Sequence, residues 1–141
     1  LGSYVIDFGP TALMRSQQYE KNLYELDAIL VTHLHGDHIG GLPMLFLHLN
    51  YDLKRTKPLV IAGPPSTAAF IETLWYSTYP STVERELTFE IQFVSWVHGQ
   101  WIEVCNRKVL SDPAIFRLSS RWASVFRVCS FISSPGAVAT A

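Results

Sequence analysis

Three of the five histidines and one aspartate of this 141-residue chain lie within six consecutive positions, at His33, His35, Asp37 and His38. Neutral imidazole nitrogens and a carboxylate are donors that zinc and other borderline divalent metals prefer. The alternative is that these histidines are ordinary hydrogen-bonded core or surface residues. That alternative requires several ligand types to coincide at close spacing by chance, so the pattern favours a metal site.

An apolar run at residues 28–31 precedes this stretch and is typical of a strand that is buried on both faces. If His33 and His35 continue the strand, their side chains share one face, because side chains alternate along extended backbone. Asp37 and His38 follow in the turn, where they can point to a neighbouring position. One short stretch can thus supply ligands for two adjacent metals.

Asp7 ends a short apolar strand that we expect at residues 4–8, before a Gly-Pro pair that breaks regular structure. In that place it can orient a metal ligand through a hydrogen bond. It can equally be a turn or capping aspartate, and the sequence leaves both interpretations open. After the histidines, Gly40 and Gly41 are expected to let the backbone pass close to a metal centre without a Cβ clash.

The elements around these residues alternate between helix and strand patterns. We expect helices at about residues 11–24, 42–53 and 68–76, and further strands at residues 59–62 and 87–93. Ser66 is expected to cap the third helix. Residues 97–100 are expected to form a turn that brings residues 101–104 back as a hairpin partner of the preceding strand. This order predicts mixed α/β layers.

Two features near the second helix are interpreted as surface features. His48 lies off the apolar stripe of that helix, which indicates an exposed histidine. Residues 54–57 hold three basic side chains just after the helix, where cations suit the helix dipole. A solvated helix end is therefore favoured there over a phosphate-binding turn.

The composition limits the classes of partner. A length of 141 residues suits one domain with its own core, and the net charge of −1 provides no overall basic field for nucleic acid or an anionic membrane. No apolar run approaches the roughly 18 residues that a membrane span needs. Cys105 and Cys129 form no CxxC pair or disulfide framework, so a cytoplasmic location is predicted. The first residues lack the pattern of a signal peptide, and we expect the chain to begin inside a longer gene product.

The character of the sequence changes at about residue 113. Residues 113–141 contain no Asp, Glu or Lys and show neither strand nor helix periodicity. We therefore predict a partial domain over residues 1–112 and an irregular tail over residues 113–141.

Taken together, these motifs resemble those of the metallo-β-lactamase superfamily. The His-Leu-His-Gly-Asp-His run at residues 33–38 is similar to its metal motif, and residues 6–10 are similar to its preceding aspartate-glycine strand end. The following Gly-Leu-Pro at residues 41–43, and the strand and turn at residues 59–64, are similar to the ribonuclease Z-like branch. The resemblance covers roughly residues 3–115. It implies an α/β fold, the N-terminal half of a four-layer αββα sandwich.

The resemblance also implies a metal-dependent hydrolase with two Zn²⁺ ions, or other divalent metals, in a complete site. His33 and His35 would bind one metal and Asp37 and His38 the second, with Asp37 also the catalytic general base. Such a pair of metals suits phosphodiester hydrolysis by an activated water. The implied substrate is RNA, such as a precursor tRNA 3′ end, or a small phosphodiester. A thioester or lactam hydrolase of the same fold remains an alternative.

Further ligands that the resemblance implies are not found downstream. No Gly-Asp pair occurs after Asp37, and Phe116 stands where a further histidine is expected. His98 falls in the predicted hairpin turn, so we do not expect it to take that place. We hypothesise a truncated member whose reading frame shifts near residue 115, which translation of the other two frames would test. The alternatives are a non-catalytic fragment, or a homodimer in which a second chain supplies ligands.

Overall fold

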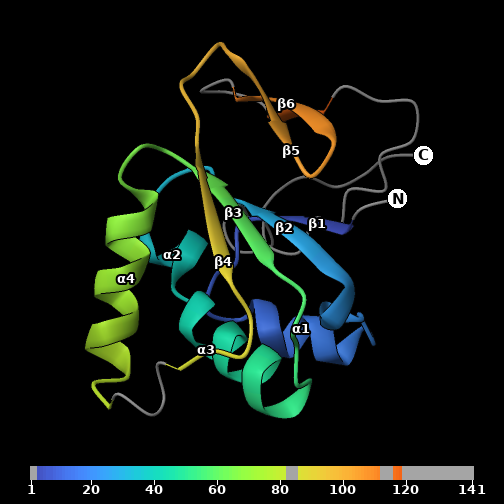
Figure 1. The fold of residues 1–141 in the computed structure, drawn as a ribbon, viewed down its shortest axis with the longest axis vertical. Helices are drawn as coiled ribbons and strands as arrows, with labels where there is room; N and C mark the ends of the chain where they lie inside the picture. Colours follow the sequence, from blue (N-terminus) through green and yellow to red (C-terminus); the bar gives the residue numbers. More distant parts are fainter. Residues whose placement is uncertain (1–2, 82–85, 112–115, 119–141) are drawn as a thin grey trace, which may run out of the picture.

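The computed structural model describes residues 3–81, 86–111 and 116–118, which form two sheets and a layer of helices (Figure 1). The strands are β1 (Ser3–Ile6), β2 (Leu26–Leu30), β3 (Leu59–Gly63), β4 (Ile91–Ser95), β5 (Trp101–Val104), β6 (Arg107–Ser111) and β7 (Phe116–Leu118). The helices are α1 (Ala12–Gln18), α2 (Gly36–Ile39), α3 (Leu42–Leu47) and α4 (Thr67–Thr78), with a 3-10 turn η1 (Leu23–Glu25) and a π turn η2 (His48–Asp52).

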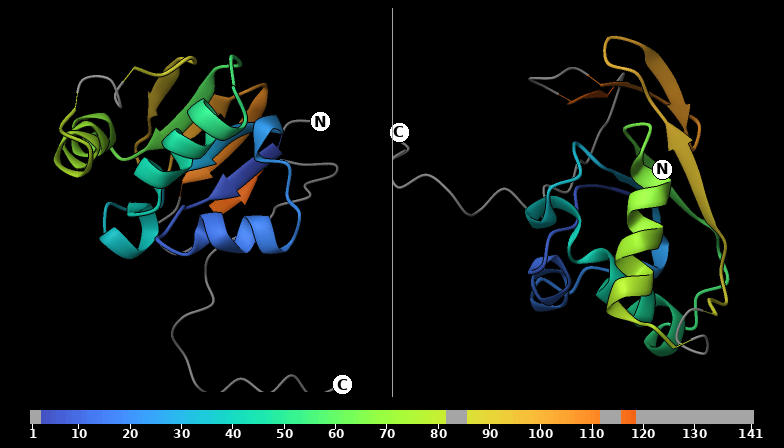
Figure 2. Two further views of the ribbon diagram at one scale, coloured as in Figure 1. Left: turned by 90° about the horizontal axis from the view of Figure 1, so that it is seen from below. Right: turned by 90° about the vertical axis from the view of Figure 1, so that its left-hand side faces the viewer.

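The two sheets differ in strand direction. The first is parallel, in the order β1-β2-β3-β4, and the second is antiparallel, in the order β5-β6-β7. The helices cover one face of the parallel sheet and the second sheet lies on the other side (Figure 2). A cluster of buried side chains fills the space between the sheets: Tyr4, Ala28, Leu30, Ala62, Trp96, Val104 and Val109. The predicted mixed α/β architecture is confirmed, as three layers in the order helix, sheet, sheet.

The parallel sheet follows from its central strands. Ile29 and Leu30 of β2 and Ile61 of β3 are fully buried, as continuous apolar runs predict for strands covered on both faces. β1 pairs with β2 from Tyr4↔Ala28 to Ile6↔Leu30. Because all four strands run the same way, their carboxyl ends meet at one edge. The histidine stretch leaves the sheet at that edge.

The first helix is shorter than predicted. α1 ends at Gln18 instead of continuing to residue 24, and Glu20 has a left-handed backbone with φ of 51°. The chain then forms η1, where the Asn22 side chain accepts a hydrogen bond from Tyr24 N at 3.1 Å. Ser66 is the N-cap residue of α4, as predicted, but its side chain makes no capping hydrogen bond there.

The predicted hairpin is wrong. β4 pairs with β3 in parallel and β5 pairs with β6, so residues 101–104 are not the partner of the alternating strand. The first half of the alternating run does not join the sheet, because the Asn50 side chain accepts hydrogen bonds from Thr88 N at 2.7 Å and Thr88 Oγ1 at 3.0 Å. The true hairpin turn is Cys105–Asn106, whose positive φ values of 46° and 63° suit a two-residue turn between twisted strands.

The basic turn at residues 54–57 is only partly solvated. Arg55 is fully buried, which corrects the surface interpretation of this residue, whereas Lys54 is exposed. Arg55 donates hydrogen bonds to the carbonyl oxygens of Tyr24 (2.5 Å), Leu26 (2.8 Å), Lys57 (2.6 Å) and Pro58 (2.6 Å). These acceptors lie at the amino ends of β2 and β3, so Arg55 joins the two strands at the end opposite to the histidines.

Little of the predicted tail can be compared with the structure. Residues 116–118 form β7 and pair with β6, so regular structure continues past residue 113. Residues 119–141 lie outside the described part of the chain, and the boundary at residue 112 stays a prediction. In the described ranges, no helix combines the length and the hydropathy needed to cross a bilayer.

Candidate metal centre

The candidate site lies at the carboxyl ends of β1 and β2. Asp7 directly follows β1, and Thr32 and His33 come shortly after β2. The short helix α2 then carries Asp37 and His38. Ligand sites in α/β proteins commonly form at this edge of a parallel sheet, where loops from neighbouring strands meet.

Glycines hold the loop after β1 against α2. Phe8 N donates to the carbonyl oxygen of His38 at 2.6 Å, and Gly41 N donates to that of Phe8 at 3.0 Å. A Cβ on Gly9 would overlap the Asp37 carbonyl oxygen, and one on Gly41 would overlap the Gly9 carbonyl oxygen. The expectation for Gly41 is therefore corrected: the close approach is to the backbone of the β1 loop. This contact fixes where α2 presents its side chains.

The three histidine rings gather beside this loop. The ring centroids of His33 and His38 are 3.9 Å apart, and those of His33 and His35 are 4.6 Å apart with the rings edge to face. Burial lowers the pKa of His33, and the neighbouring His38 and His35 lower it further. His33 is thereby biased toward the neutral imidazole, the form that binds metals.

Asp7 contacts this cluster on the side of the His38 ring that carries Nδ1. Its carboxylate is buried, with Oδ2 2.6 Å from His38 Nδ1, and it accepts hydrogen bonds from Thr32 N at 2.7 Å and Thr32 Oγ1 at 2.8 Å. Of the two interpretations left open for Asp7, the geometry matches the orienting one. A carboxylate that accepts the proton of one ring nitrogen directs the other nitrogen of that histidine toward a ligand.

The other ring nitrogen of His38 faces Asp37. Its Nε2 lies 3.4 Å from Asp37 Oδ2. Two donor atoms that bind one zinc ion tetrahedrally, at about 2.0–2.2 Å each, lie roughly 3.4 Å apart. With the proton of His38 on Nδ1, both facing atoms carry lone pairs, and a cation between them relieves their repulsion. This pair therefore fits one shared metal.

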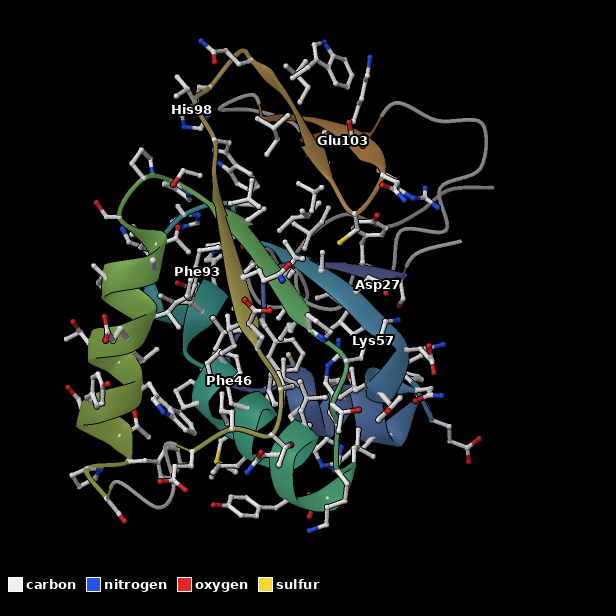
Figure 3. All side chains as sticks on the ribbon, viewed as in Figure 1. Asp27, Phe46, Lys57, Phe93, His98 and Glu103 are labelled. Carbon is white, nitrogen blue, oxygen red and sulfur yellow. The ribbon has the colours of Figure 1, made fainter. Side chains whose placement is uncertain are left out.

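The rest of the ligand set is incomplete in the described residues. Within residues 3–81, 86–111 and 116–118, no three His, Cys, Asp or Glu side chains are arranged to hold a metal ion together. His98 lies in the loop beyond β4 (Figure 3). His48 is outside the cluster and pairs with Asp52 at 2.6 Å, and its side chain is 14% exposed, so it lies half-buried at the surface and is less exposed than predicted. The donor types suit zinc, and the described residues provide part of a site.

Sequence reasoning missed Thr32. Its hydroxyl contacts Asp7 as well as His33 Nδ1 at 2.9 Å. The available signal was a hydroxyl residue at the end of a buried strand, directly before the first histidine. Such a residue can reach polar groups on both neighbouring loops.

Comparisons with known proteins show the family of the chain. The family described as "Anti-Pycsar protein Apyc1" matches residues 2–114. The chain belongs to this family. Among similar proteins, the Paenibacillus sp. (strain J14) Apyc1 is 38% identical over 82 residues, which are 58% of this chain and 31% of that protein. A ribonuclease Z of Lachnoclostridium phytofermentans is 31% identical over 109 residues, which are 77% of this chain and 34% of that protein.

Solved structures show the fold of this Apyc1-family chain. Zn²⁺-bound PqqB from Methylobacterium extorquens has a TM-score of 0.53 at 13% identity, covering 82% of this chain and 41% of that chain. The metallo-β-lactamase fold protein YhfI from Bacillus subtilis has a TM-score of 0.52 at 21% identity, covering 78% and 42%. The resemblance to the metallo-β-lactamase superfamily and its ribonuclease Z-like branch is confirmed, with the expected fold. The chain spans about a third of the length of the curated relatives it matches.

Proposed function

We propose that this chain contributes the first half of the metal site of a hydrolase, a phosphodiesterase of the ribonuclease Z-like type. The observation that carries the proposal is the line of contacts from buried Asp7 through His38 to Asp37. It presents a bare ring nitrogen and a carboxylate oxygen 3.4 Å apart, at the spacing of two ligands on one metal. Relatives named ribonuclease Z support RNA as a substrate.

The residues have separate roles in this proposal. His33 and His35 bind one metal, and Asp37 and His38 bind the second. Two Zn²⁺ ions, when bound, supply Lewis acidity against the charge that builds up on the phosphoryl oxygens. The Asp37 side chain is 78% exposed, so as the general base it is open to an entering water and can take its proton. Asp7 keeps a proton on His38 Nδ1 and leaves Nε2 free.

The charge of the chain bears on the kind of substrate. The net charge of −1 provides no overall basic field, which supports a short RNA end or a small phosphodiester over an extended duplex. A thioester or lactam substrate is the alternative within the same fold. The cytoplasmic location and a homodimer stay predictions.

A second candidate function is a non-catalytic chain that binds metal weakly. It is favoured by the finding that the described residues bring no three metal-binding side chains together. Fewer ligands per metal lower the affinity and leave a nucleophile poorly positioned.

Metal content and hydrolysis separate these functions. The full 141-residue chain is loaded with zinc, dialysed, and assayed for zinc per chain and for cleavage of a phosphodiester reporter, a thioester, a lactam and a tRNA with a 3′ extension. We expect about two zinc ions per chain, with the ligands that the described residues lack supplied by a second copy of the chain. We also expect phosphodiester cleavage, which Asp37→Asn reduces by about 10²-fold or more. His48→Asn is the matched control and keeps both properties, because His48 pairs with Asp52 outside the cluster. Less than one zinc per chain with no cleavage would favour the non-catalytic candidate.

A further inference from the structure

The hydroxyl of Thr32 lies among three polar groups of the candidate site. Its Oγ1 is 2.8 Å from Asp7 Oδ2, 2.9 Å from His33 Nδ1 and 3.3 Å from His38 Nδ1. A hydroxyl has one proton to donate and two lone pairs that accept. Where that single proton goes determines which ring nitrogens carry protons of their own.

The carboxylate of Asp7 sets the direction of these hydrogen bonds. An ionised carboxylate only accepts hydrogen bonds, so the Thr32 hydroxyl donates a hydrogen bond to Asp7 Oδ2. His38 Nδ1, at 2.6 Å from the same oxygen, also donates to it. The Thr32 oxygen keeps its lone pairs and can accept a hydrogen bond from the N–H of His33 Nδ1. Both histidines are then protonated on Nδ1 and have a bare Nε2.

We propose that Thr32 is a positioning residue that fixes His33 in the tautomer protonated on Nδ1. Asp7 acts directly on His38, whereas it acts on His33 only through the Thr32 hydroxyl. This inference rests on the proposed function in one respect, because the purpose of a bare Nε2 on His33 is to bind a metal. The hydrogen bonds that carry it belong to the chain itself.

The backbone makes Thr32 suitable for this role. Val31 N donates to the Ala62 carbonyl oxygen at 2.7 Å, which ties the end of β2 to β3. Thr32 N donates to Asp7 Oδ1 at 2.7 Å, so backbone and hydroxyl of one residue hold both oxygens of the carboxylate. The backbone bond remains in any non-proline substitution. The hydroxyl can therefore be tested on its own.

Two substitutions isolate the hydroxyl. Thr32→Val keeps the shape of the side chain and removes the donor and the acceptor, whereas Thr32→Ser keeps the hydroxyl and removes a methyl group. In the valine variant a proton on His33 Nδ1 faces a methyl group and has no acceptor. The proton then moves to Nε2, where it competes with a metal.

The tautomers are determined in the metal-free full chain from long-range proton–nitrogen correlation spectra. The spectra are recorded in mildly alkaline buffer, and each histidine signal is assigned by a single substitution. In the native protein and in Thr32→Ser, we expect His33 and His38 protonated on Nδ1. In Thr32→Val, we expect His33 protonated on Nε2 and His38 unchanged, because Asp7 still holds it. Zinc affinity should fall about 10–100-fold in Thr32→Val and stay near the native value in Thr32→Ser.

A His33 that stays protonated on Nδ1 in Thr32→Val overturns the inference, and so does a serine variant that behaves like the valine variant. If Thr32→Val does not fold, Thr32→Ala, which also lacks the hydroxyl, takes its place. A tautomer change in a protein that binds no zinc supports the role of Thr32 and counts against the proposed function. The two failures are thus distinguishable.

Discussion

The two ends of the parallel sheet each hold a buried charge, and the two charges have different partners. Asp7 at the carboxyl end accepts from the side chains of Thr32 and His38, and that line of contacts continues to exposed Asp37. Arg55 at the amino end donates, among the described residues, only to main-chain carbonyl oxygens. Both satisfy the requirement that a buried charge be hydrogen-bonded. Only the carboxyl end connects its charge to solvent through side chains that can bind a ligand.

The comparison separates stability from function. The backbone carbonyl groups that bind Arg55 cannot change their protonation or move away from it. Arg55 therefore holds the strands together and takes no part in catalysis. Partners that are imidazoles and a hydroxyl can direct protons, so the Asp7 end can prepare a site. We therefore expect substitutions at the amino end to change the free energy of unfolding, and those at the carboxyl end to change metal binding more than stability.

The largest effect on stability is expected for Arg55→Ala. The substitution leaves the carbonyl oxygens of Tyr24, Leu26 and Pro58 without their donor and opens a cavity over Phe89. We expect a loss of about 3–5 kcal/mol in the free energy of unfolding, measured by urea denaturation. The matched control is Lys54→Ala in the same turn.

Lys54 is exposed, so its replacement should change stability by less than about 0.5 kcal/mol. Equal losses for the two variants would contradict the buried role of Arg55. The fraction of Arg55→Ala that remains folded should still bind zinc, because the histidines are at the other end of the sheet.

The next effect concerns the contact that positions α2. Gly9→Ala places a Cβ against the Asp37 carbonyl oxygen, and we expect a loss of about 2–3 kcal/mol together with weaker zinc binding. Gly36→Ala is the control, because a Cβ there meets nothing within 4 Å. At the start of a helix it should be neutral or stabilising by up to about 1 kcal/mol. Thermal unfolding of both variants compares them, and a Gly9→Ala variant as stable as Gly36→Ala would rule out the close packing.

The two ends also differ in what the sequence could predict. The histidines of the site lie within six consecutive positions, so their spacing was visible, and the gathering of His33, His35 and His38 follows from one strand end and one helical turn. Arg55 could not be recognised, because its acceptors are backbone groups up to 31 residues away that any residue type provides.

The strand errors have a similar cause. The alternation at residues 87–93 indicated a strand, and the part that became β4 is only its end, because Asn50 and Arg55 bind Thr88 instead. A side chain that hydrogen-bonds to the backbone of a distant segment leaves no pattern in the local sequence. The layer order was predicted from the family resemblance. The alternation of apolar residues alone did not predict it.

A smaller effect on stability, with a large effect on binding, is expected for Asp7→Asn. Asn tolerates the left-handed backbone at this position, where φ is 58°, so the change tests the charge and not the strain. We expect a loss of about 1–2 kcal/mol in the free energy of unfolding and a fall of about 10–100-fold in zinc affinity. Calorimetric zinc titration and urea denaturation measure the two. A loss of stability as large as that of Arg55→Ala, with zinc affinity unchanged, would reverse the comparison between the two ends.

The smallest effect concerns Lys57 and Asp27, which lie side by side at the amino end (Figure 3). Burial raises the pKa of Asp27, but the hydrogen bonds from Lys57 and from the Ser3 backbone outweigh it and leave the pKa lowered. A carboxyl group with a lowered pKa in the folded state stabilises the protein above its ordinary pKa of 3.8, and this contribution is lost as the pH falls through the folded value. The native chain should therefore lose this stability only in acid.

Asp27→Asn tests this by urea denaturation between about pH 3 and about pH 7. The variant should be less stable by under about 1 kcal/mol near neutral pH, because Lys57 is partly exposed and solvent screens the pair. The difference from the native chain should shrink toward the acid end, where Asp27 itself becomes protonated. A difference that grows as the pH falls would have the wrong sign for a paired carboxylate. Zinc binding should not change, because this pair, like Arg55, lies at the end of the sheet opposite to the histidines.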